Sequence, residues 1–260
     1  MWYVLAAKPG AALVYGFNQD MDACRVRDAL ANRTIAKYLN HVPVRKDDLF
    51  YIEAGTVHAI GAGAVIAEIQ ESSNITYCLY DYDRVDKNGK HRELHVDKAL
   101  AVANLSASNS PRQPMRVLRY KNGCASELLT RCKYFQVERL ILNTEVHRNL
   151  ATYQTDSTSF HALLCVDGCG VLFGDGGGSE NGFNSNANSS SDSEYAGFGV
   201  VKSVDGNHSC GANIGENYDT CSVDSGNVTI PFFKGDCIFV PADSMPLKLH
   251  GKAQVLDVRC

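Results

Sequence analysis

The sequence of 260 residues lacks long apolar segments. Runs such as 62–67 and 238–240 fall far short of the roughly 20 residues that a membrane-spanning helix needs. It also lacks an excess of either charge, because 25 basic and 29 acidic residues are interspersed and give a formal net charge of −4. Nucleic acid and membranes are therefore not expected partners, and a small molecule or a protein is expected instead.

The sequence also lacks an export signal and the cysteine density of a disulfide scaffold. The first 20 residues lack the basic start, apolar core and cleavage site of a signal peptide, so a cytoplasmic location is expected. Ten cysteines at irregular spacing are too few for a disulfide scaffold. The nearest approach to a metal knuckle, Cys165 to Cys169, has no second pair at ligand spacing. Buried or incidental thiols are expected rather than a zinc site.

Short strands are what the sequence has in abundance. Apolar segments rich in β-branched and aromatic residues alternate with Gly and Pro turns, whereas helical spacing is confined to 20–40 and 93–105. The pattern predicts a mostly β chain with a sandwich or barrel in each half. The expected strands are 2–6, 12–17, 42–44, 48–52, 64–70, 75–82, 134–142, 161–166, 170–173, 228–233, 237–240, 247–250 and 253–258.

One segment cannot form a core. In 174–197, 16 of 24 residues are Gly, Ser or Asn, and the mixed composition continues to about residue 227. The composition predicts a flexible surface loop inserted between two strands, because long insertions cost little additional closure entropy.

Three side chains could carry chemistry. His58 follows a tight turn at Gly55, which could direct its imidazole into a barrel mouth to bind a divalent metal; a hydrogen-bonded histidine in the barrel wall is the alternative. Glu68 supplies a carboxylate on the next expected strand. Arg84 supplies a guanidinium suited to phosphate, although a solvated turn explains its surroundings equally well.

The motifs around these residues closely resemble the type I mannose-6-phosphate isomerase family, in its short bacterial form of two cupin barrels. The resemblance is specific between residues 48 and 105, continues more weakly from 134 to the C-terminus, and leaves out only about 174–227. It rests on Glu53-Ala-Gly-Thr-Val-His-Ala59, Glu68-Ile-Gln70, Tyr80-Asp-Tyr-Asp-Arg84, Arg92-Glu-Leu-His95 and the stretch from Phe233 to Ala242.

The resemblance implies a domain organisation. Two cupin-like jelly-roll barrels are expected: 1–105 as the C-terminal part of a catalytic cupin, 106–132 as a linker, and 133–260 as a second cupin carrying the insertion. The family residues that would complete the first barrel precede the position of Met1. An incomplete barrel would leave strand edges and apolar surface uncovered, and Trp2 is expected on that exposed face.

The resemblance also implies site residues and a cofactor. In the family a divalent metal, usually zinc, is held by a Gln, a His, a Glu and the histidine that matches His58; the first three are expected upstream of Met1. Glu68 matches an active-site carboxylate, and Arg84 a basic position near the substrate phosphate. Cys78 stands where the family has its catalytic arginine, and it lacks a fixed positive charge.

The implied reaction interconverts mannose 6-phosphate and fructose 6-phosphate through an enediolate. A sugar phosphate is thus the implied partner. Without the metal cage and the arginine, this chain alone is expected to be inactive or weakly active. A non-catalytic sugar-phosphate-binding cupin module and a decayed gene fragment are the alternative interpretations.

Overall fold

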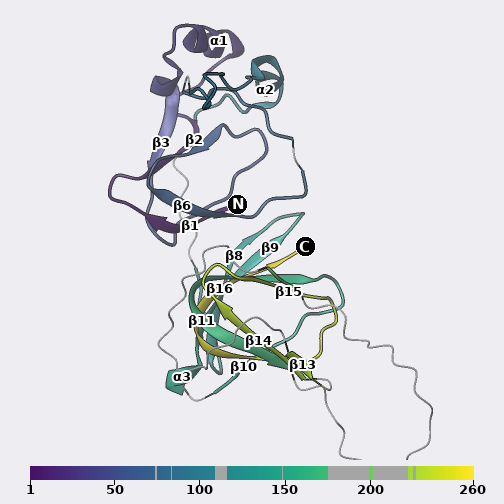
Figure 1. Ribbon diagram of the computed structural model, residues 1–260. Coiled ribbons are helices and arrows are strands. Elements are labelled where there is room, and N and C mark those ends of the chain that lie inside the picture. Colours follow the sequence, from purple (N-terminus) through teal and green to yellow (C-terminus); the bar gives the residue numbers. More distant parts are fainter. Residues whose placement is uncertain are drawn as a thin grey trace, which may run out of the picture. The chain divides into compact units, whose positions relative to one another are not determined.

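The computed structural model divides the chain into two compact units, 1–114 (unit 1) and 115–260 (unit 2) (Figure 1). Each unit is built mainly from antiparallel strands, as the sequence predicts. Most of the Gly/Ser/Asn-rich insertion lies outside the described residues. The structure describes 1–73, 75–82, 84–108, 116–147, 149–174, 199–201, 222–224 and 227–260.

Unit 1 contains two three-stranded sheets, in the orders β4-β1-β6 and β3-β2-β5. The first two expected strands, 2–6 and 12–17, do not pair with each other; β1 and β2 lie in different sheets and pair with later strands. The elements of unit 1 are β1 (Trp2–Ala7), β2 (Ala12–Phe17), α1 (Ala23–Ala31), a 3₁₀ turn (Ile35–Tyr38), β3 (Leu39–Pro43), β4 (Leu49–Phe50), β5 (His58–Ile60), β6 (Ala64–Glu68) and α2 (Val96–Val102).

The core of unit 1 encloses Trp2, whose side chain is only 3% exposed. It packs in one cluster with Val4, Leu13, Val42 and Phe50, which come from both sheets. The expectation that Trp2 lies on an uncovered surface is therefore wrong. The two sheets that are present bury it between them.

The two helices of unit 1 lie near each other at one end of the sheets (Figure 1). Asp22 begins α1 by accepting a hydrogen bond from the backbone N–H of Arg25, as a helix-capping aspartate does. Arg27 on α1 then forms an exposed ion pair with Asp97 on α2, at 2.9 Å. These helices occupy the ranges in which the sequence shows helical spacing.

The expected strand at 75–82 does not form in the described residues of that range. The backbone N–H of Cys78 donates to the imidazole of His95 at 3.3 Å, and its carbonyl accepts from the His95 N–H at 2.7 Å. His95 thus bonds both the backbone N–H and the backbone carbonyl of Cys78, and Cys78 does not pair with a strand. Hydrogen bonds to the imidazole and to the backbone N–H of His95 replace the strand pairing that the apolar pattern predicts.

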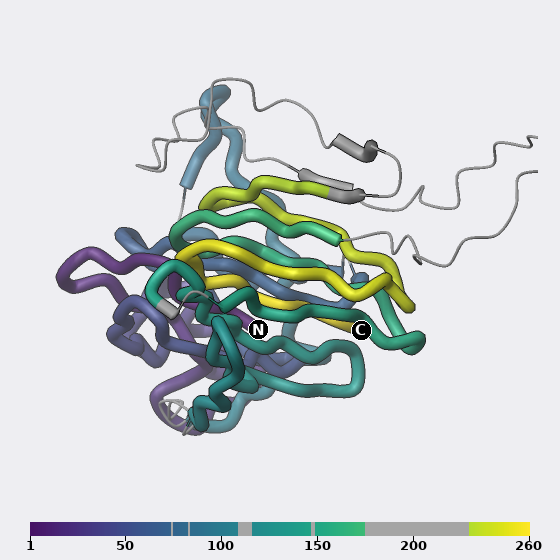
Figure 2. Tube along the Cα trace, turned by 90° about the horizontal axis from the view of Figure 1, so that it is seen from below, coloured from purple at the N-terminus to yellow at the C-terminus, as the bar shows by residue number. Residues whose placement is uncertain are grey.

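Unit 2 is dominated by two long strands, β11 and β16, that pair along almost their whole length. In Figure 2 the yellow C-terminal strand runs beside the green one. The sequence predicts two separate strands in each of these places. A bulge between Cys165 and Asp167, followed by Gly168 in the left-handed region with φ +78°, bends the ladder without ending it.

Strands β7 and β8 also belong to unit 2, although their residues fall in the expected linker 106–132. The main path of the sheet is β12-β15-β11-β16-β9-β8-β7, with β10, β13 and β14 paired beside it. The elements are β7 (Arg119–Lys121), β8 (Cys124–Arg131), β9 (Gln136–Asn143), α3 (Thr144–His147), β10 (Ala151–Tyr153), β11 (His161–Gly174), β12 (Gly199–Val201), β13 (Ser222–Asp224), β14 (Asn227–Phe233), β15 (Cys237–Val240) and β16 (Leu247–Arg259).

The core of unit 2 consists mainly of buried aliphatic and aromatic side chains from six of these strands, β9, β10, β11, β14, β15 and β16. Cys165 lies inside it, and burial raises the pKa of its thiol to about 12. A thiol held protonated in this way packs as a small apolar residue and is a poor metal ligand. Across the described part of the chain, no helix is long and apolar enough to cross a membrane.

Candidate active site

His58 begins β5, directly after the turn that contains Gly55. Its Nδ1 lies 2.7 Å from the carbonyl oxygen of Thr56. A carbonyl can only accept, so Nδ1 carries a proton, and in the neutral form of the ring Nε2 is the unprotonated nitrogen. This is the tautomer in which histidine binds a metal or accepts a proton, with the backbone carbonyl fixing the ring orientation.

Trp2 brings His58 and Glu68 to one face of unit 1. The rings of Trp2 and His58 meet edge to face, with centroids 5.2 Å apart. Glu68 is directly opposite Trp2 in the β1–β6 pair, which puts the two side chains on the same face of the sheet. Both His58 and Glu68 are exposed, whereas Trp2 beneath them is buried.

Tyr15 adds a hydroxyl near this face. It lies opposite His58 in the β2–β5 pair, its ring is 6.4 Å from that of Phe50, and its hydroxyl donates to the Tyr51 carbonyl at 3.0 Å. Burial, followed by the charge of Glu53, raises the pKa of Tyr15. The phenol therefore stays protonated at neutral pH and acts as a hydrogen-bond donor.

Arg84 belongs to a second group, centred on the carboxylate of Asp81. The Arg84 guanidinium forms a close ion pair with Asp81, and Arg92 approaches the same oxygen at 3.9 Å. The hydrogen bond and charge of Asp81 raise the pKa of Arg84. Two guanidinium groups share one largely buried carboxylate, so this group carries a surplus positive charge that suits an anion such as phosphate.

Cys78 lies close to this second group. It is 8% exposed, and its Sγ lies 3.8 Å from the carbonyl oxygen of Tyr80, the residue before Asp81. The ring of His95, which is bonded to the Cys78 backbone, also faces Tyr77 with centroids 6.1 Å apart. A short side chain without a fixed positive charge therefore lies beside the segment that carries Asp81.

The structure thus gathers the four residues singled out in the sequence into two groups, His58 with Glu68 and Cys78 with Arg84. Sequence reasoning overlooked Trp2, which links the first pair. The position of Trp2 follows from the register of β1 with β6 and from its ring contact with His58 on the other sheet, neither of which the sequence pattern records.

The residues present do not complete a metal site. Zinc normally takes at least three protein ligands. Among the described residues, no cluster of three or more His, Cys, Asp or Glu side chains is arranged to hold a metal. His58 therefore supplies one imidazole ligand, and the described residues do not supply the other ligands that a zinc site needs.

The turn before His58 can be tested through Gly55. This glycine has φ +87°, and a Cβ added to it would lie 2.6 Å from the Val102 carbonyl oxygen. Gly10 has a similar φ of +82° with nothing within 4 Å of the added Cβ. Both alanine variants should lose about 1–2 kcal/mol of stability to backbone strain, and Gly55→Ala about 1–3 kcal/mol more to the clash.

Urea unfolding followed by Trp2 fluorescence measures this difference, because Trp2 is the only tryptophan and lies in unit 1. Equal losses in Gly55→Ala and Gly10→Ala would show that the turn does not pack against the end of α2 as described.

Comparison with known proteins identifies relatives of the chain, although no family model matches it. It is 38% identical over 104 residues to mannose-6-phosphate isomerase of Streptococcus mutans, which covers 40% of this chain and 33% of that protein. It is 35% identical over 139 residues to mannose-6-phosphate isomerase ManA of Bacillus subtilis, covering 52% of this chain and 42% of ManA. The alignments thus span less than half the length of these relatives.

The fold agrees with these relatives. The crystal structure of mannose 6-phosphate isomerase from Bacillus subtilis superposes with a TM-score of 0.69 at 22% identity, covering 99% of this chain and 63% of that one. The expected mostly β, cupin-like architecture is confirmed. Over the aligned residues the chain is therefore similar in sequence to mannose-6-phosphate isomerases, and it shares the fold of the Bacillus subtilis structure.

Proposed function

We propose that this chain is part of an enzyme that interconverts mannose 6-phosphate and fructose 6-phosphate. The observation that carries the proposal is the identity of 35–38% to two mannose-6-phosphate isomerases. In this proposal, unit 1 is the C-terminal part of the catalytic cupin and unit 2 is the second cupin. The cytoplasmic location expected from the sequence is part of the same proposal.

In this proposal the group around Asp81 binds the phosphate, and the group around Trp2 acts on the sugar. Arg84 and Arg92 bind the substrate phosphate, exchanging part of their interaction with Asp81 for phosphate oxygens. Glu68 is the candidate base that moves the proton between the two carbons of the enediolate. His58, with its unprotonated Nε2, and Tyr15, with its protonated hydroxyl, orient the sugar oxygens.

Zinc is the expected cofactor of this proposal, and it would supply charge stabilisation for the enediolate. His58 is the one residue of this chain proposed to hold it. Since the described residues do not complete a cage, no step is assigned to the metal in this chain.

The purified chain is expected to retain less than one equivalent of zinc after desalting, as measured by elemental analysis, because one histidine gives little affinity. The cysteines can bind stray metal, so His58→Ala is the control. A full equivalent in the chain that disappears in His58→Ala would contradict the expectation.

The function is tested in a fusion protein that places the N-terminal segment of ManA, up to the position aligned with Met1, ahead of this chain. We expect the fusion to bind zinc and to isomerise mannose 6-phosphate at a low but measurable rate. His58→Ala should abolish the rate with loss of zinc, and Glu68→Gln should abolish it with zinc retained. Binding of the sugar phosphate without any turnover would instead favour a non-catalytic binding module.

A further inference from the structure

A pocket of about 370 Å³ lies at one end of the two sheets of unit 1. Residues 7–11, at the turn from β1 to β2, form one wall, and residues 43–46, at the end of β3 and just after it, form the other. The volume falls in the range of roughly 300–1,000 Å³ that is typical of sites for small molecules. The pocket is therefore large enough to hold a small ligand.

This pocket is separate from the group around Trp2. Ala7, in the first wall, lies opposite Ala64 at the start of β6. Trp2 lies opposite Glu68 at the end of the same strand. The two ends of this five-residue strand are roughly 13 Å apart. A ligand in the pocket therefore does not depend on the isomerase activity proposed for the other end of the strand.

Backbone hydrogen bonds fix both walls of the pocket. The N–H of Ala11 donates to the carbonyl of Lys8 at 3.0 Å, which closes a four-residue turn. Pro9 and Gly10 are the central residues of this turn, and the φ of +82° at Gly10 is the value that such a turn requires. The N–H of Val44 donates to the Ala11 carbonyl at 3.1 Å and ties the second wall to the first. The pocket is therefore formed before a ligand binds, which lowers the cost of binding.

The base of the pocket is apolar. Ala11 and Val44 line it and are buried, with exposures of 4% and 6%, and Pro9 and Pro43 line it as well. A Cβ added to Gly10 would meet nothing within 4 Å, so the space beside the turn is open. Such a surface suits the ring or hydrocarbon part of a ligand.

Three cationic residues, Lys8, Arg45 and Lys46, line the same pocket, and no acidic residue is among those that line it. This local excess contrasts with the net charge of −4 of the whole chain. Arginine holds phosphate bidentately, and lysine adds a point charge. A phosphate monoester carries a charge of about −1.5 to −2 at neutral pH, so it uses more of these cations than a single carboxylate does.

The nearest carboxylates along the chain have other partners. The Tyr3 hydroxyl donates to Oδ1 of Asp47 at 2.7 Å. The backbone N–H of Arg45 donates to Oδ2 of Asp48 at 2.7 Å. Neither carboxylate lines the pocket. The two anions reduce the positive potential of the pocket without cancelling it, because the cations there outnumber them.

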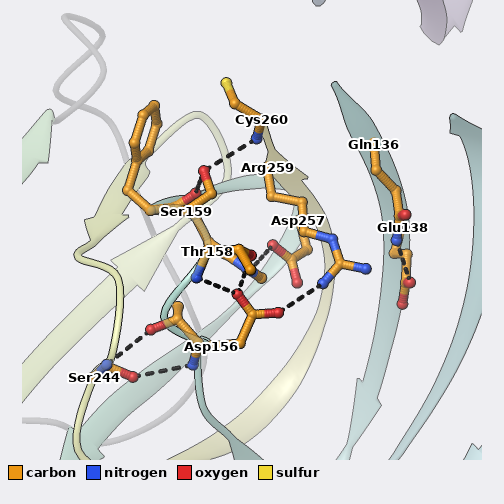
Figure 3. Close-up of polar contacts among 12 residues, drawn as sticks. Gln136, Glu138, Asp156, Thr158, Ser159, Ser244, Asp257, Arg259 and Cys260 are labelled. Carbon is orange, nitrogen blue, oxygen red and sulfur yellow. Dashed lines mark hydrogen bonds and ion pairs between the residues drawn. The ribbon is translucent and has the colours of Figure 1, made fainter. Parts of the chain in front are cut away.

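Charged side chains at one end of unit 2 show a different arrangement. There Asp156 accepts from the backbone N–H of Thr158 at 2.9 Å and lies 3.7 Å from the guanidinium of Arg259 (Figure 3). That cation has an anion of the protein beside it. Within the described ranges, the side chains of Lys8 and Arg45 form no such ion pair, so their charges are available to a ligand.

We propose that this pocket of unit 1 binds a small organic phosphate. Its phosphate group interacts with Arg45 and the lysines of the two walls, and its apolar part rests against Ala11 and Val44. The combination of a preformed apolar base and a cationic border distinguishes this ligand class from an uncharged sugar and from a free inorganic anion.

The site is tested with phenyl phosphate, added at constant ionic strength to the full chain labelled with ¹⁵N-glycine and followed by NMR. We expect a saturable shift of the Gly10 amide, which belongs to the first wall, and none at Gly123 of unit 2, the internal reference. Phenol, which lacks the charge, should cause no shift, and inorganic phosphate, which lacks the ring, should bind more weakly.

Three results of this titration would overturn the proposal. The first is a Gly10 amide that does not respond to phenyl phosphate. The second is equal affinity for phenyl phosphate and inorganic phosphate. The third is a shift at Gly89, in the turn that follows Arg84, without one at Gly10, because the phosphate would then bind only at the group around Asp81. Since the two glycines report on different sites, failure here and failure of the proposed substrate site are distinguishable.

Arg45→Gln is the variant that tests the phosphate contact. Arg45 is exposed and keeps its backbone bond to Asp48, so the variant should fold and should bind phenyl phosphate about tenfold more weakly. Lys37→Gln is the matched control, because Lys37 is an exposed cation of unit 1 that does not line the pocket. An unchanged affinity in Arg45→Gln would overturn the proposal. So would an equal loss in Lys37→Gln, which would show general attraction by charge instead of a site.

Discussion

Replacing Cys78 by arginine in the ManA fusion is expected to raise the turnover of mannose 6-phosphate by about 10²–10³, with a smaller change in KM. A loss of this size is typical when a single preorganised donor to a developing oxyanion is removed. Restoring the family's arginine at this position should therefore recover it. The rate of isomerisation at saturating substrate is the measurement.

The structure gives the reason for expecting a gain at this position. The Cys78 thiol lies 3.8 Å from the carbonyl oxygen of Tyr80, the residue before Asp81, and Asp81 in turn holds Arg84. An arginine at 78 would extend from a fixed backbone, since His95 bonds both the N–H and the carbonyl of Cys78. Its fork of donors would then act on the substrate beside the existing guanidinium groups.

Cys78→Lys is the matched control, because lysine supplies the charge without the planar fork. We expect it to recover only a small part of the rate. A fusion with equal turnover before and after Cys78→Arg would mean that another residue already performs the role, with Arg84 as the first candidate. Because the Cys78 side chain is buried, a larger residue there could disturb packing, and thermal unfolding of each variant shows whether the fold is retained.

The local motifs were the part of the site that the sequence could predict. A glycine turn three residues before His58 has a fixed geometry, and the structure shows why only glycine fits: its φ is +87° and a Val102 carbonyl blocks any Cβ. The pairing of His58 with Glu68 through Trp2 depends on strand register instead. Register joins residues more than 50 positions apart, which no local pattern records.

The same limit explains why β8, the longer of the two strands in the expected linker, was not predicted. In β8, Ser126 and Glu127 are buried, so the segment shows none of the polar and apolar alternation that marks a strand. Glu127 is tolerated inside because Arg139, directly opposite on β9, forms an ion pair with it. A polar residue buried by a partner on another strand looks like part of a loop when only the sequence is read.

The second large effect is expected in stability, when a side chain is removed from the core of unit 1. Phe50 is 1% exposed and lies opposite Trp2 in the β1–β4 pair, so Phe50→Ala should lower the free energy of unfolding of unit 1 by about 3–5 kcal/mol. Tyr51, the next residue, is 40% exposed, and Tyr51→Ala retains the carbonyl that accepts from Tyr15. The matched control should therefore lose less than about 1 kcal/mol. Urea unfolding read by Trp2 fluorescence compares them.

The outcome bears directly on the candidate site. Phe50 and Tyr15 pack beneath the face on which Trp2 holds His58, so a cavity at Phe50 should also loosen the contact between the two rings. We therefore expect the fluorescence of folded Phe50→Ala to become more accessible to a soluble quencher, with no such change in Tyr51→Ala. If both variants unfold alike, unit 1 does not close around Trp2, and the positions derived for His58 and Glu68 no longer hold.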